Sequence, residues 1–263
     1  MLLAIDVGNT HIVVGVYENE HLVNKWRMAT DVAKTADEYG VLLCQLFSSS
    51  NLSSSAFDGA VLSCVVPPLV SMWQELCQKF LKLDLLVIGP GTKSGIQIVY
   101  DNPREVGADR VANAAGAQFL YENENIIAVD FGTATTFDCI SSDGKYIGGA
   151  ISPGLSVAAD ALYKAAAKLP RVELTPPPHP IGKNTVDSIR SGLMFGYAAL
   201  VEGMVSRLSA QFDSPPRVIA TGGFASLLSE QCDTIEDVVP DLTLNGLRII
   251  YERNRKASSK SGK

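Results

Sequence analysis

The sequence has few of the residues that mark secreted, metal-binding or membrane proteins. Its 263 residues include five cysteines, without a Cys-x-x-Cys pair, and three histidines without metal-ligand spacing. We therefore expect reduced cysteines in the core of a cytoplasmic protein, and neither a disulfide framework nor a zinc site. No apolar run has the length of a membrane span, and Asp6 interrupts the N-terminal run. We expect no transmembrane helix and no signal peptide.

Positive charge is also scarce. Lys and Arg number 22 against 28 Asp and Glu, which gives a formal net charge of −6. Proteins that bind nucleic acids usually present a basic face, and only the tail from Arg253 to Lys263 is basic here, so we expect no nucleic-acid partner. We expect the Ser- and Lys-rich residues 255–263 to be disordered. The sequence also lacks Gly-x-x-x-x-Gly-Lys-Ser/Thr, which excludes a P-loop kinase.

One short motif occurs twice, as Asp6-Val7-Gly8-Asn9-Thr10 and as Asp130-Phe131-Gly132-Thr133-Ala134. The second copy follows the first by 124 positions (130 − 6). Each copy lies between two apolar, strand-like runs, and a third such run follows at the same offset. The sequence therefore predicts an internal duplication of a three-stranded unit.

The chemistry of this repeated turn suits a phosphate group. A carboxylate at the end of a buried strand is costly unless it is paired or holds a metal ion. Glycine lets a ligand approach the backbone, and Asn9 or Thr133 adds further donors. Alternatively, each Asp-x-Gly is an ordinary β-hairpin turn. Two copies in register favour binding of a nucleotide's phosphates and its cation.

Periodicity predicts the elements around these turns. The first half has the order β-β-β-α-β-α-β, with one helix starting at the capping box Thr35–Glu38 and another at Pro67-Pro68. In the second half, helices are expected through Leu155, Leu162 and Leu169, over about Val186–Phe212, and from about Asp241.

Asp109 and Arg110 fall near the start of a predicted helix through Val111 and Ala115. At such a position Asp is usually an N-cap and Arg a solvated surface residue. The functional alternative makes Asp109 a general base and Arg110 the ligand of a carboxylate or phosphate.

Four motifs occur together in this chain: the two turns above, Gly107-Ala108-Asp109-Arg110 and Thr221-Gly222-Gly223. In this order they resemble the type III pantothenate kinases, from Met1 to about Asn254. The resemblance implies an α/β fold with two duplicated ribonuclease H-like (actin-like ATPase) domains, whose mixed sheets are flanked by helices, and a nucleotide cleft between them. We place these domains at residues 1–118 and 119–254.

The resemblance also implies the reaction, which is ATP-dependent phosphorylation of the 4′-hydroxyl of pantothenate, the first step toward coenzyme A. It implies a divalent metal such as Mg²⁺, a monovalent cation (K⁺ or NH₄⁺) and a homodimer with a shared active site.

Individual roles follow from the same resemblance. It makes Asp109 the general base, Asp6 the carboxylate associated with the divalent metal, and Asp130 the ligand of the monovalent cation. The expected nucleotide contacts are Asp6, Val7, Gly8, Asn9, Thr10, His11, Ile12, Val13 and Thr133. The expected pantothenate contacts are Tyr100, Gly107, Ala108, Asp109, Arg110 and Thr185. Thr185 has an alternative role as a simple cap of the long helix.

Two other functions remain open at this point. One is a non-catalytic accessory or regulatory relative, which the intact Asp6, Asp109, Arg110 and Asp130 argue against. The other is a different small-molecule kinase, or a phosphatase, of the same superfold, which fold alone does not exclude.

Overall fold

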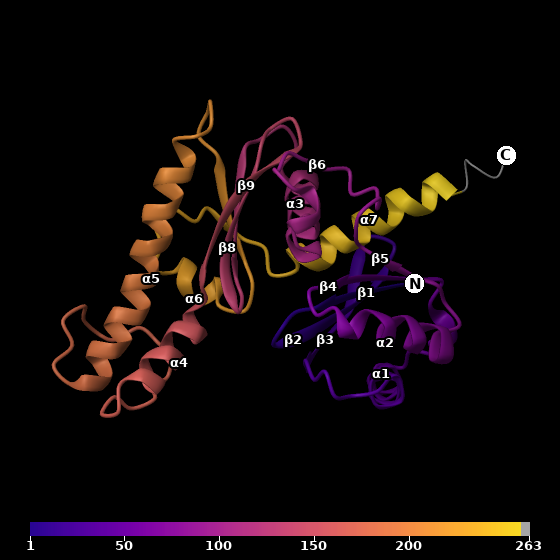
Figure 1. Cartoon of the computed structure of the whole chain (residues 1–263), viewed down its shortest axis with the longest axis horizontal. Coiled ribbons are helices and arrows are strands. Elements are labelled where there is room, and N and C mark those ends of the chain that lie inside the picture. Colours follow the sequence, from indigo (N-terminus) through magenta and orange to yellow (C-terminus); the bar gives the residue numbers. More distant parts are fainter. Residues whose placement is uncertain (259–263) are drawn as a thin grey trace. The chain divides into compact units, whose positions relative to one another are not determined.

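A computed structural model describes residues 1–258 and divides the chain into two compact units (Figure 1). The first unit is discontinuous in sequence and combines Met1–Ile96, Asp101–Phe119 and the residues from Leu242 onward. The second unit combines Gln97–Tyr100 with Leu120–Asp241. The chain therefore leaves the first unit, builds the second, and returns.

The first unit contains a five-stranded sheet in the order β3-β2-β1-β4-β5. Strands β1 and β2 are antiparallel, as are β2 and β3, whereas β4 runs parallel to β1 and β5 parallel to β4. The strands are β1 (Leu2–Val7), β2 (His11–Glu18), β3 (His21–Ala29), β4 (Gly59–Cys64) and β5 (Leu85–Val87).

Helices cover both faces of this sheet, which explains why β1 is almost continuously apolar. Leu3 and Ile5 share a core cluster with Tyr39 of α1 (Ala36–Ser49) and Trp73 of α2 (Pro68–Leu76). Helix α7 (Leu242–Ser258) packs on β1, β2 and β4. The remaining helical elements of this unit are α3 (Ala108–Leu120), the π-helix η2 (Cys77–Leu81) and the short 3₁₀ turns η1 (Ser54–Ala56) and η3 (Pro103–Glu105).

The second unit repeats the strand order and the pairing pattern of the first. Its six-stranded sheet has the order β11-β10-β7-β8-β9-β6, so β9-β8-β7-β10 corresponds to β3-β2-β1-β4. Strand β10 is parallel to β7, as β4 is to β1. The strands are β6 (Gln97–Ile98), β7 (Ile126–Phe131), β8 (Ala134–Ile140), β9 (Lys145–Pro153), β10 (Arg217–Thr221) and β11 (Asp237–Val238).

Three helices accompany this second sheet: α4 (Leu155–Ala165), α5 (Thr185–Ser209) and α6 (Ala225–Ser229). One face of β7, with Ile127 and Val129, shares a core cluster with Leu193 of α5 and Leu228 of α6. The long helix is thus anchored within its own unit through one face.

The predicted duplication and the predicted α/β fold are confirmed. The bounds of β1 and β3, moved by the offset of 124, coincide with those of β7 and β9. The capping box at Thr35 is also present, because its side chain accepts from Glu38 N–H while the Glu38 carboxylate accepts from Thr35 N–H.

Two details differ from the sequence-based expectation. Helix α4 ends at Ala165 rather than including Leu169, because a turn closes it and Pro170 disfavours a helical conformation at the preceding residue. The domain bounds also differ: residues 242–254, expected in the second domain, group with the first unit through α7, which continues through residues 255–258, and residues 97–100, expected in the first domain, group with the second unit. The rest of the expected disordered tail, residues 259–263, lies outside the described residues.

The cysteines and the helices agree with the composition. All five cysteines are free thiols, and Cys77, Cys139 and Cys232 are buried. Among the helices of residues 1–258, none combines the length and the apolar character that a membrane span requires.

Candidate functional site

The first predicted turn is a β-hairpin between β1 and β2, closed by a hydrogen bond of 3.0 Å from Gly8 N–H to the His11 carbonyl. Asn9, Thr10 and His11 are exposed at its tip. The hairpin interpretation is therefore right about the backbone, and it leaves the exposed tip available to a ligand.

The other residues of the first turn region that are expected to contact the nucleotide lie on strands β1 and β2. Val7 and Ile12 are fully buried in the core of the first unit, so neither exposes its side chain to a ligand. Asp6 and Val13 are paired across β1 and β2 and are half-buried. The carboxylate of Asp6 thus lies at the carboxyl end of a buried strand, as the motif predicts.

The structure brings the start of helix α3 to this same edge of the first sheet. Val65, just after β4, donates its N–H to the Val7 carbonyl at 3.0 Å. The Cγ1 atom of Val65 lies 3.8 Å from the position of a Cβ atom built on Gly107. A Cβ atom on Gly107 would also collide with Asp109 Oδ1. Glycine at position 107 therefore leaves room for the Asp109 carboxylate beside the strand ends.

Asp109 lies in the first turn of α3 and is half-buried. Its Oδ1 atom accepts a hydrogen bond of 2.8 Å from Arg110 N–H. Burial raises the pKa of the Asp109 carboxyl, and this effect exceeds the opposing effects of the Arg110 N–H and guanidinium. Arg110 alone would lower this pKa, so the direction of the shift follows from burial.

Ala108 begins α3 and is half-buried, whereas Arg110 is only 8% exposed. The expectation that Arg110 is a solvated surface residue is therefore wrong. Buried guanidinium groups need polar or anionic surroundings, which is compatible with an anion-binding role.

The second predicted turn is also a β-hairpin, but it is one residue shorter than the first. Gly132 N–H donates to the Ala134 carbonyl at 3.1 Å and closes the hairpin between β7 and β8. Thr133 is exposed at its tip, and Asp130 is half-buried at the strand end. Both turns therefore present a carboxylate, a glycine and an exposed polar residue in the same order.

Glycine is required where the turn after β10 meets Asp130. Gly222 has a φ of +93°, and a Cβ atom there would collide with Asp130 Oδ1 and would lie 2.7 Å from the backbone of Phe131. Gly222 therefore shapes the surroundings of Asp130. The Thr221-Gly222-Gly223 motif pointed to this turn, but it did not show what the glycine contacts.

Tyr100 and Thr185 both belong to the second unit. Tyr100 follows β6 and is 38% exposed, with its ring centroid 6.3 Å from that of Tyr146. Thr185 is the exposed first residue of α5, whose N-cap is Asn184, because the Asn184 side chain accepts from Asp187 N–H at 2.9 Å. The interpretation of Thr185 as the cap is therefore wrong, and its hydroxyl is available for another role.

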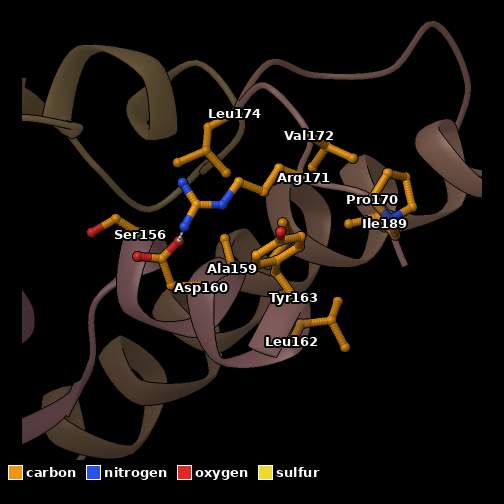
Figure 2. Close-up of a pocket in the computed structure, with 11 residues that line it drawn as sticks. Ser156, Ala159, Asp160, Leu162, Tyr163, Pro170, Arg171, Val172, Leu174 and Ile189 are labelled. Atoms are coloured by element: carbon orange, nitrogen blue, oxygen red, sulfur yellow. Dashed lines mark ion pairs between the residues drawn. The ribbon is translucent and has the colours of Figure 1, made fainter. Parts of the chain in front are cut away.

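A cavity of about 190 Å³ lies between α4 and α5 and contains none of the predicted site residues (Figure 2). Arg171 crosses it, paired with Asp160 at 3.8 Å, and its guanidinium carbon lies 4.7 Å from the ring centroid of Tyr163. The other lining residues are mainly apolar: Ala159, Leu162, Pro170, Val172, Leu174, Ile189 and Leu193. The charged residues of its lining, Asp160 and Arg171, are paired with each other.

The predicted ion sites are single carboxylates. Within residues 1–258, no group of three or more His, Cys, Asp or Glu side chains is arranged to hold a metal ion. Asp6 and Asp130 therefore fit an ion that takes most of its ligands from water and phosphate oxygens, as Mg²⁺ commonly does. They do not fit a zinc site.

Comparison with known proteins identifies the relatives of this chain. The family model described as type III pantothenate kinase matches residues 2–207. The type III pantothenate kinase of Pelobacter propionicus is 50% identical over 257 residues, which cover 97% of this chain and all of the relative.

Solved structures extend the likeness in fold. The activator of 2-hydroxyisocaproyl-CoA dehydratase from Clostridium difficile, with bound ADPNP, has a TM-score of 0.58 at 13% identity, covering 98% of this chain and 97% of that one. A Campylobacter jejuni protein named for the Baf family of transcriptional activators has a TM-score of 0.59 at 18% identity, with 97% and 99% covered. The fold is that of the actin-like and sugar-kinase ATPases.

The raised pKa of Asp109 generates a prediction about stability. Between the ordinary pKa near 3.8 and the raised folded value, the folded chain binds more protons than the unfolded chain. Stability therefore falls as pH rises through this window. Asp109→Asn removes the ionisation and keeps Oδ1 as an acceptor, so we expect a higher Tm than that of the wild type at pH 7. Each kcal/mol corresponds to about 2–4 °C for a chain of this size.

Thermal melts between pH 4 and pH 8 check this expectation, and the difference in Tm should shrink toward pH 4. The matched control is Asp213→Asn at an exposed carboxylate of the second unit, which should leave the pH profile unchanged. A lower Tm for Asp109→Asn at pH 7 would contradict the assignment of burial as the dominant cause.

Proposed function

The chain belongs to the type III pantothenate kinase family, and from this premise we propose that it transfers the γ-phosphoryl group of ATP to the 4′-hydroxyl of pantothenate. The observation that carries the proposal is the pair of carboxylates at one edge of the first unit's sheet. Asp6 ends a strand beside a glycine turn, and Asp109 lies at a helix start linked to that strand end through Val65. Phosphoryl transfer needs such positioning and charge neutralisation more than covalent help.

The first turn is proposed to hold the phosphates of ATP. Asn9 and Thr10 are exposed at the tip and bring backbone and side-chain donors, whereas the Gly8 N–H is used by the His11 carbonyl and Gly8 lets a phosphate approach the backbone. Asp6 is proposed to hold Mg²⁺ directly or through water. When bound, the metal ion neutralises negative charge on the phosphates.

Asp109 is proposed to accept the proton of the pantothenate hydroxyl. The hydroxyl oxygen attacks the γ-phosphorus, its proton moves to the Asp109 carboxylate, and ADP leaves. Burial raises the pKa of Asp109, which makes its carboxylate a stronger base than an exposed one. Arg110 is proposed to bind the carboxylate of pantothenate, with Gly107, Ala108 and Tyr100 as further contacts.

The second turn is proposed to complete the nucleotide site. Thr133 is exposed at the tip of the second turn, at the position that Asn9 has in the first copy. Asp130 is proposed to hold a monovalent cation, K⁺ or NH₄⁺, with oxygen atoms as the remaining ligands. The close approach of Gly222 to Asp130 Oδ1 supports a fixed carboxylate at this position.

A homodimer with a shared active site is the third part of the proposal. Around the start of α5 the second unit exposes large apolar side chains, including Ile181 at 82% and Val186 at 38%. Ile151 on β9 is 66% exposed. An apolar patch formed by such residues would favour an interface, and Thr185 lies between Ile181 and Val186 in sequence. Thr185 is proposed to contact pantothenate bound to the other subunit.

The reaction is tested by mixing purified protein with ATP, Mg²⁺ and pantothenate and measuring ADP and phosphorylated product. We expect one ADP for each phosphopantothenate formed. Asp109→Asn should lower turnover by about 10²–10⁴-fold, the usual cost of removing a general base, while the chain stays folded. Nearly full activity in this variant would show that Asp109 is not the base. No turnover of pantothenate by the wild type would favour the accessory or alternative-kinase interpretations.

The cation proposal predicts a salt effect. Replacing Na⁺ by K⁺ at constant ionic strength should raise the turnover of the wild type, because K⁺ is the ion that the family resemblance implies for the proposed site. Asp130→Ala should lose this response, whereas Asp213→Ala, an exposed residue of the same unit, should keep it. Equal rates in the two salts for the wild type would contradict the proposal.

The shared site predicts complementation between two impaired variants. Asp109→Asn and Thr185→Val should each be poorly active alone. Mixing them under conditions that exchange subunits should restore activity, because one site in the mixed dimer then has both residues intact. No recovery after exchange is confirmed by native mass spectrometry would mean that each chain builds its own site.

A further inference from the structure

Thr30, the residue that follows β3, forms hydrogen bonds to the first turn at Gly8 and at Thr10. Thr30 donates its backbone N–H to the Thr10 carbonyl at 3.0 Å and its hydroxyl to the Gly8 carbonyl at 2.7 Å. One residue therefore fixes the turn from outside the β1–β2 hairpin. Thr30 is half-buried, so water competes only partly for these bonds.

The position of Thr30 is itself fixed by a buried side chain. Tyr39 of α1 is fully buried, and its hydroxyl accepts from Asp31 N–H at 2.9 Å and donates to the Ala29 carbonyl at 3.2 Å. The residues before and after Thr30 are thus attached to the same phenol in the core. Thr30 is therefore a rigid support for the turn and not part of a loose loop.

The hydroxyl bond determines the direction of one peptide plane. In a trans peptide the C=O of one residue and the N–H of the next point in opposite directions. Holding the Gly8 carbonyl toward Thr30 therefore turns the Asn9 N–H away from Thr30. Asn9 is exposed at the tip of the turn, on the side open to a ligand.

The second copy of the repeat shows that this bond belongs to the first turn alone. The offset of 124 places Gly154 at the position equivalent to Thr30. Gly154 N–H donates to the Thr133 carbonyl at 3.0 Å, so a backbone bond to the turn is retained. A Cβ atom on Gly154 would collide with the carbonyls of Gly132 and Thr133. The second turn therefore excludes a side chain where the first uses a hydroxyl.

We propose that Thr30 is a positioning residue for nucleotide binding, whose hydroxyl holds the Gly8–Asn9 peptide so that the Asn9 N–H faces a phosphate of ATP. The inference rests on the proposed function of the first turn as a phosphate loop. It assigns no contact between Thr30 and ATP itself, so the effect of Thr30 is transmitted through the backbone of Gly8 and Asn9.

The test compares Thr30→Val, which has the shape of threonine without its hydroxyl, with Thr30→Ser, which keeps the hydroxyl. Binding of the ATP analogue ADPNP with Mg²⁺ is measured by calorimetry, and kcat and KM are measured for ATP and for pantothenate. We expect Thr30→Val to weaken ADPNP binding and to lower kcat/KM for ATP by about 3- to 10-fold, the order expected for one hydrogen bond. KM for pantothenate should stay within about 2-fold, and Thr30→Ser should restore nucleotide binding.

A matched control separates positioning from general loss of stability. Thr35→Ala removes the capping box of α1 in the same unit. It should lower Tm, since such caps commonly contribute about 1 kcal/mol, without changing ADPNP affinity. Equal affinities for the wild type and Thr30→Val would overturn the proposal, as would failure of Thr30→Ser to restore binding.

Direct binding of ADPNP also separates this inference from the proposed reaction. If the wild type binds ADPNP but does not phosphorylate pantothenate, the reaction assignment fails while the role of Thr30 is still decided by the binding series. If the wild type phosphorylates pantothenate and Thr30→Val binds ADPNP normally, the reaction stands and the role of Thr30 fails.

Discussion

Parallel pairing of buried strands determines where polar chemistry is possible in this fold. Strands β1 and β4 run side by side in the same direction, with helices packed on both faces of their sheet. Apolar side chains therefore fill the strands, and polar groups are confined to the edge where the strands end. Asp6 and the residue after β4 meet at that edge, and β7 with β10 repeats the arrangement around Asp130.

The two turns are similar, but the residues that form hydrogen bonds to them differ between the two copies. After β3 the chain continues into a loop attached to Tyr39, and the support is a hydroxyl. After β9 the equivalent residue, Gly154, is the N-cap of α4, and backbone packs directly on backbone. Each copy thus has a backbone bond to its turn, to Thr10 in the first and to Thr133 in the second, while a side chain supports the first turn and a helix follows the second.

The sequence predicts local features of this molecule better than its long-range contacts. The two hairpins, the Thr35 capping box and the start of α2 at Pro68 follow from short-range backbone chemistry, and the structure has all of them. The direction of the Asp109 pKa shift and the burial of Arg110 depend on segments distant in sequence, which a local pattern does not contain. The proposed role of Thr30 rests on its hydrogen bonds to Gly8 and Thr10, which no local pattern in the sequence contains.

The family and the reaction class were predictable because four short motifs occur in a specific order, and the comparisons confirm the family. The grouping of α7 with the first unit was not predictable from the repeat. Helix α7 has no counterpart at the offset used to align the two copies, since residues 242–258 lie beyond the end of the second repeat of strands. Its membership depends on apolar contacts with β1, β2 and β4, which only the folded chain shows.

The placement of α7 has a consequence for how the protein is made. Residues 1–119 emerge from the ribosome early, yet the helix that packs on β1 and β4 emerges only after the whole second unit. Until then, β-strand surface that α7 covers in the finished protein stays open to water and to other nascent chains. The first unit therefore completes its fold only after the second unit has been synthesised. Premature termination anywhere before residue 242 leaves the unit that begins the chain unfinished.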